Sequence, residues 1–192
     1  MATTEVSICN GALLMIGGDT IMDLTDNSEE ARACAERFAH VRDSILQIHP
    51  WPFCIFRASL NASTDKPLYD YQYKFLLPTS PSCLMLLEVF EDDDWVVEDK
   101  YLVCNSAVVN IKYIGRVTDA SRYPSVVADL MSARLAYEIA YKLVGSAQVV
   151  ALAQQAYQLR LAEALSRESK VDNMPQMNDD VYTDKWARSR MF

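Results

Sequence analysis

Histidine is scarce in this sequence, which has only His40 and His49, and this scarcity narrows the chemistry that the chain can carry. The two lie nine positions apart, so at about 100° per residue they face opposite sides of a helix and cannot chelate one metal ion. The chain also lacks GxGxxG, the phosphate-binding P-loop, GxSxG and HExxH. We therefore expect no catalytic residue, no metal site and no cofactor, and we do not expect an enzyme.

Long apolar runs are missing as well. No apolar stretch approaches the ~20 residues that a membrane helix needs, and no basic region precedes an apolar one at the N-terminus. We expect a protein made in the cytoplasm, without membrane contact. The sequence also has no CxxC spacing, although it has five cysteines, each within an apolar pattern. This pattern favours buried, reduced thiols over disulfides or zinc ligands.

About half of the chain is hydrophobic (51%), and its periodicity predicts four helices. We expect them over residues 4–16, 28–48, 124–144 and 147–170, with Pro124 as the first residue of the third. In the second helix, Ala31, Cys34, Phe38, Val41, Ile45 and Ile48 recur at steps of three and four, which places them on one stripe. Short runs between 69 and 114, where apolar and polar residues alternate, predict a small antiparallel sheet.

These elements predict an α+β fold: an antiparallel four-helix bundle with an inserted small antiparallel β-sheet and an extended C-terminal tail. We divide the chain into four parts. Residues 1–68 form the N-terminal helices of the bundle and a linker, 69–114 the inserted sheet, 115–171 the C-terminal helices and 172–192 a mobile tail.

The stretch His49, Pro50, Trp51 and Pro52 is a predicted structural hinge. Each proline crowds the preceding residue out of helical geometry, so the second helix must end here. Trp51 supplies a large apolar surface directly after this stop, and we expect it to anchor the departing chain in the core. His49 then serves as a capping or packing residue beside Trp51.

The order of motifs around this stretch resembles that of one phage family. The similar positions are Ile8-Cys9-Asn10-Gly11-Ala12-Leu13, Ile16-Gly17, Leu24, Asp26, Ser28, Phe38, Arg42-Asp43, His49-Pro50-Trp51, Tyr71, Tyr73, Phe75, Leu77-Pro78 and Cys83-Leu84. With them the chain resembles, over about residues 5–165, the head-to-tail adaptor proteins of short-tailed bacteriophages, also called tail tubular protein A. None of these motifs is a catalytic fingerprint, and the specificity lies in the ordered set.

The resemblance implies a structural protein of the virion, at the junction of head and tail. It implies a ring, expected to be a dodecamer, that binds the portal protein on one side and a tail nozzle or tail tube protein on the other. DNA would pass through the lumen without specific binding. The net charge of −8 is compatible with this role, because an acidic or neutral wall lets a polyanion slide where a basic wall would hold it. Composition alone explains the same charge equally well as a means of keeping the chain soluble.

The last eight residues are basic and aromatic. They contain Lys185, Trp186, Arg188, Arg190, Met191 and Phe192, without an acidic side chain. Tails of this kind are often frayed ends without a role. The competing hypothesis is a portal-binding peptide, because tryptophan, arginine, methionine and phenylalanine are enriched at interface cores.

Two other function classes stay open. The acids Glu88, Glu91, Asp92, Asp93, Asp94, Glu98 and Asp99 suggest a polysaccharide or peptidoglycan hydrolase associated with the tail, since that chemistry needs two opposed carboxylates. A solvated turn explains the same residues more simply. A plain nucleic-acid-binding module is the second alternative, which the net charge disfavours.

Overall fold

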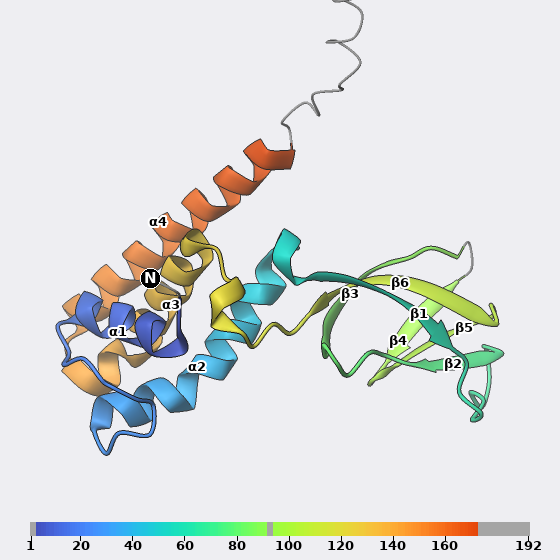
Figure 1. Cartoon of the computed structure of the whole chain (residues 1–192), viewed down its shortest axis with the longest axis horizontal. Coiled ribbons are helices and arrows are strands. Elements are labelled where there is room, and N and C mark those ends of the chain that lie inside the picture. Colours follow the sequence, from blue (N-terminus) through green and yellow to red (C-terminus); the bar gives the residue numbers. More distant parts are fainter. Residues whose placement is uncertain (1–2, 92–93, 173–192) are drawn as a thin grey trace, which may run out of the picture.

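The computed structural model of the chain describes residues 3–91 and 94–172, which form a helical lobe and a β lobe. Figure 1 shows the helices gathered at one end of an elongated molecule and the strands at the other. The fold is therefore mixed α+β, as the sequence predicts. Within the described residues, no helix is both long enough and apolar enough to cross a bilayer.

The helical lobe has α3 at its centre. Its elements are α1 (Glu5–Ile16), α2 (Glu29–Ile48), α3 (Ser125–Val144) and α4 (Ala147–Asp172). Each of the other three helices packs along α3, whereas α1 touches α2 and α4 only slightly. The buried residues of α3 include Leu130, Met131, Leu135 and Ile139, so α3 supplies the middle of the core.

Local signals explain where these helices begin and end. The Thr4 hydroxyl accepts a hydrogen bond from the Ser7 backbone N–H (3.0 Å) and Ser28 does the same for Ala31 (3.1 Å), which satisfies backbone donors at two helix starts. Gly17 and Gly145 end α1 and α3 with φ of 76° and 65°, values that side chains disfavour. Pro124 is the N-cap of α3 and not its first helical residue, a shift of one position from the prediction.

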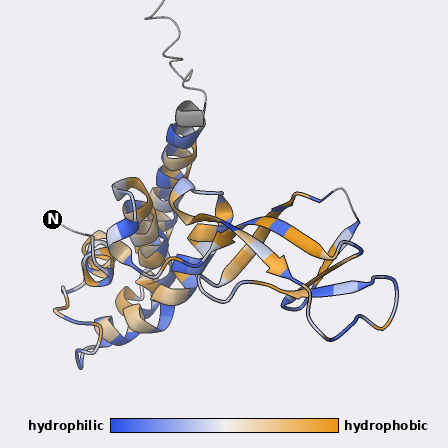
Figure 2. Ribbon diagram, turned by 45° about the vertical axis from the view of Figure 1, so that its right-hand side comes forward, coloured by the Kyte–Doolittle hydropathy of each residue, from blue (hydrophilic) through white to orange (hydrophobic). Residues whose placement is uncertain are grey.

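The β lobe consists of two three-stranded antiparallel sheets. Its strands are β1 (Ile55–Asn61), β2 (Tyr73–Leu76), β3 (Cys83–Val89), β4 (Trp95–Glu98), β5 (Tyr101–Cys104) and β6 (Val108–Gly115). Sheet A has the order β1-β6-β3 and sheet B has the order β2-β5-β4. Phe75 and Leu102 of sheet B pack with Leu60, Val109 and Ile111 of sheet A in a second hydrophobic core. Figure 2 shows apolar colour along these strands, and mixed apolar and polar colour around the helices.

The expectation of one small sheet over 69–114 is therefore wrong in two respects. The strands form two sheets, and β1 precedes residue 69. The strand predicted from Tyr69 begins only at Tyr73, while Tyr69 itself is 75% exposed. The signal for β1 was present, because Phe56, Ala58 and Leu60 alternate with exposed polar residues at the period of a strand.

Candidate functional site

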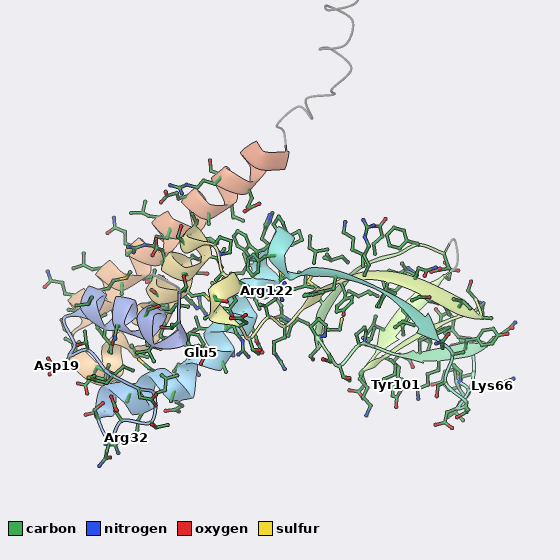
Figure 3. The ribbon with its side chains drawn as sticks, in the orientation of Figure 1. Glu5, Asp19, Arg32, Lys66, Tyr101 and Arg122 are labelled. Atoms are coloured by element: carbon green, nitrogen blue, oxygen red, sulfur yellow. The ribbon has the colours of Figure 1, made fainter. Side chains whose placement is uncertain are left out.

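The two lobes meet at a junction made of two chain segments. Residues 49–54 leave α2 and enter β1, and residues 116–124 leave β6 and return to α3. The predicted hinge lies in the first of these segments. Figure 3 labels Arg122 of the second segment, which lies where the helices meet the strands.

The second helix ends where Pro50 and Pro52 predict. α2 ends at Ile48, and His49 takes an extended conformation (φ −147°, ψ 146°) before Pro50. The His49 ring contacts the Trp51 ring edge to face, with 4.9 Å between their centroids. Ile48 is 42% exposed, so the buried part of the predicted apolar stripe of α2 ends at Ile45, three residues before the end of the helix.

Trp51 is the anchor of the departing chain. It is only 1% exposed, and its indole Nε1–H donates to the Ile45 carbonyl at 2.9 Å. The Trp51 carbonyl accepts from the Cys54 backbone N–H at 3.0 Å and from the Cys54 thiol at 3.2 Å. Burial raises the pKa of Cys54 to about 11, so the thiol stays neutral at physiological pH. Because of these bonds, residues 49–54 cannot change direction unless Trp51 leaves the core.

An ion-pair network joins the two lobes beside this anchor. The Asp43 carboxylate of α2 accepts from Arg42 Nε (2.9 Å) through one oxygen and from Arg116 Nε (2.9 Å) and Nη2 (2.8 Å) through the other. Arg116 follows β6 directly, and its backbone N–H donates to the Ser82 carbonyl. Asp43 thus ties the last turns of α2 to the chain that leaves sheet A.

Further contacts cross the junction. Arg122 donates to the Phe53 carbonyl (3.0 Å) and places its guanidinium 5.7 Å from the Phe56 ring centroid. Gln47 Nε2 donates to the Leu84 carbonyl of β3 at 2.9 Å. The Tyr123 hydroxyl donates to the Val117 carbonyl at 2.6 Å, and burial raises the pKa of this tyrosine to about 12. Each contact gives a polar group of the junction a partner, which is what a permanent structural joint requires.

Gly115, the last residue of β6, packs closely against Phe56 of β1. A Cβ at this position would lie 2.5 Å from the Phe56 ring and 3.0 Å from Pro81. The position therefore has no room for a side chain, although its backbone is ordinary.

In the acidic turn, the Glu91 carboxylate binds Asn110 of β6. Both oxygens of Glu91 accept from the Asn110 backbone N–H, at 2.8 and 2.9 Å, and one also accepts from the Asn110 side chain. Asp92 and Asp93 lie outside the described residues. Within the described residues, no group of histidine, cysteine and carboxylate side chains could hold a metal ion, and all five cysteines are thiols, of which only Cys83 is not fully buried.

The residues proposed for portal binding lie outside the described part of the chain. They are Lys185, Trp186, Arg188, Arg190, Met191 and Phe192. Sequence reasoning located the helix stop before Pro50 but missed Asp43, Arg116 and Arg122 as a group. Arg116 and Asp43 are 73 residues apart and Arg122 and Phe53 are 69 apart, so no local pattern signals these pairs.

No family model matches the chain, and no curated protein matches it.

Proposed function

We propose that the protein is a structural head-to-tail adaptor of a short-tailed bacteriophage virion. In this proposal identical copies form a ring, expected to be a dodecamer, that joins the portal protein to the tail nozzle or tail tube protein. DNA passes through the lumen, and the protein performs no chemistry.

The observation that carries the proposal is the bonded junction between two unlike lobes. A joint between two larger assemblies must transmit force without changing its own shape. The Asp43 network, buried Trp51 and the Arg122 contacts connect the lobes through side chains that already have partners. One of the stretches on which the resemblance to the adaptor family rests, His49 to Trp51, lies in this junction.

The helical lobe offers surface for contacts between copies. Leu14 of α1 and Leu152 and Leu159 of α4 are each more than half exposed. Apolar side chains in these positions favour contact with a further protein surface. We propose that the four helices work as the predicted antiparallel bundle, with α3 at its centre, and that neighbouring bundles meet through this surface. In such a contact, one patch of a copy meets a different patch of its neighbour. The copies then close into a ring when the rotation from one copy to the next allows closure.

The tail supplies portal attachment in this proposal. Lys185, Arg188 and Arg190 would meet carboxylates on the portal, and Trp186, Met191 and Phe192 would enter apolar grooves between its subunits. In a ring every copy repeats the contact, so a weak peptide holds through multivalency.

Electron microscopy of the purified protein mixed with its portal tests the proposal. Light scattering should show a monomeric or weakly associated protein on its own, and class averages of the mixture should show a closed ring on the portal. Portal alone and protein alone are the controls. A protein that stays monomeric with its own portal would overturn the adaptor function.

A further inference from the structure

Strand β4 is an open edge of sheet B. It pairs with β5 on one side, and in the described chain no strand pairs with its other side. Alternate residues of such an edge turn their backbone N–H and C=O groups outward, where they can pair with an added strand. Edge strands are commonly guarded by lysine, proline, a bulge, other charged side chains or shortness, and β4 has only the last two, as four residues that end in Glu98.

The apolar face of sheet B extends onto β4, where its side chains are partly exposed. Trp95 lies opposite Cys104 and Val97 lies opposite Leu102, so each pair shares one face of the sheet. Leu102 and Cys104 are buried in the core of the β lobe, whereas Trp95 and Val97 are both 39% exposed. Among the described residues, the edge therefore combines outward-facing backbone groups with partly exposed apolar side chains that have a neighbouring strand on one side only.

Charge decides which kind of strand fits. Asp94, Glu98 and Asp99 are exposed at the two ends of β4, and Lys100 is the one cation of the β4–β5 hairpin. Two copies of β4 paired antiparallel would bring these acids together, and like charges opposite each other are destabilising. The edge thus disfavours a second copy of itself and favours an extended segment that is cationic and apolar.

We propose that residues 185–192 of the same chain dock along the β4 edge. This segment has three cations, three large apolar side chains and no acidic side chain, which is the composition that the edge favours. The twelve intervening residues, 173–184, reach up to about 40 Å when extended. The inference does not rest on the adaptor function, since the contact lies within one chain. If both hold, the portal competes with the β4 edge for the segment.

Hydrogen exchange of the full-length chain tests this contact. The wild type is compared with the variant Lys185→Gln, Arg188→Gln and Arg190→Gln, and the readout is the exchange rate of the β4 amides. A short linker gives an effective concentration on the order of 1 mM. A segment that binds with an affinity of about 0.1 mM then slows the outward-facing amides about tenfold, and the variant loses this protection. The amides of β6, which is central in sheet A, are the internal control.

A charge exchange makes the test specific. Asp94→Lys with Glu98→Lys should remove the protection, and so should Lys185→Glu with Arg188→Glu and Arg190→Glu. A variant that carries both sets of substitutions should regain the protection of the β4 amides. Equal β4 exchange in the wild type and the glutamine variant would overturn the proposal, as would failure of the combined variant to regain protection. Protection that grows with protein concentration would assign the contact to a second copy and would also overturn it.

Discussion

At the scale of single residues, the junction depends most on Trp51. Trp51→Ala should lower the free energy of unfolding by about 3–5 kcal/mol, because it empties a large buried site and removes the bond to the Ile45 carbonyl. Urea denaturation followed by circular dichroism measures this change. Trp95→Ala is the matched control, since Trp95 is an exposed edge residue and should cost much less. Equal losses for the two tryptophans would show that Trp51 is not an anchor.

Tyr123 gives the junction a pH dependence on the alkaline side. Its pKa of about 12 in the folded protein lies above the value of about 10 for an exposed tyrosine, chiefly through burial, and the Arg42 charge opposes the rise. Between these values the folded state keeps a proton that the unfolded state loses. This contribution to stability is therefore complete below about pH 10 and falls as the pH rises toward 12.

The measurement is the unfolding free energy of the wild type and Tyr123→Phe between about pH 8 and 11. The variant loses the bond to the Val117 carbonyl, so its free energy of unfolding at about pH 8 should be lower than that of the wild type. Between about pH 8 and 11 this free energy should fall less steeply in the variant than in the wild type. Tyr141→Phe, at an exposed position of α3, should keep the wild-type slope. Parallel declines for the wild type and Tyr123→Phe would contradict the assignment.

At the scale of elements, Asp43 connects α2 to the chain after β6. Asp43→Asn should destabilise the protein by about 1–3 kcal/mol, because it leaves Arg42, a largely buried cation, without its carboxylate. Chemical denaturation gives the value. Arg167→Gln breaks the exposed pair with Glu163 in α4 and should stay within about 0.5 kcal/mol. A similarly small effect at Asp43 would mean that the network adds nothing to the junction.

The close passage of β6 and β1 makes a second prediction at this scale. Gly115→Ala should cost about 1–3 kcal/mol, since its Cβ would lie within 2.5 Å of the Phe56 ring. Gly18→Ala is the comparison, because a Cβ there meets Leu13 at an ordinary 3.4 Å. The melting temperatures of the two variants, measured by calorimetry, should differ clearly, and an unchanged value for Gly115→Ala would show that Phe56 can move away.

At the scale of the whole molecule, stability and attachment should separate. Deleting residues 185–192 should lower the melting temperature by only a few degrees, because the core clusters of both lobes lie within the described residues and docking on β4 would add only about 1.4 kcal/mol. The same deletion should abolish attachment to the portal, measured by co-sedimentation of protein with portal. If the shortened chain sediments with the portal as the full chain does, the tail is a frayed end and attachment uses the helices.

Much of the fold followed from local sequence. Period and caps predict all four helices to within a few residues, because a helix buries one regular stripe and ends at prolines and glycines such as Pro50 and Gly145. The stop after Ile48 and the burial of Trp51 also followed, since both depend on neighbours in the chain. Strands β3 to β6 were predicted for the same reason, from runs of apolar residues bounded by polar turns.

What the tertiary structure alone decided depends on residues far apart in the chain. The division of six strands into two sheets is set by pairing across the chain, as when β1 pairs with β6, which begins 47 residues after β1 ends. The Asp43–Arg116 pair forms only once both lobes are in place. Such contacts leave no periodic trace, because their free energy depends on distance in space and not on spacing in sequence.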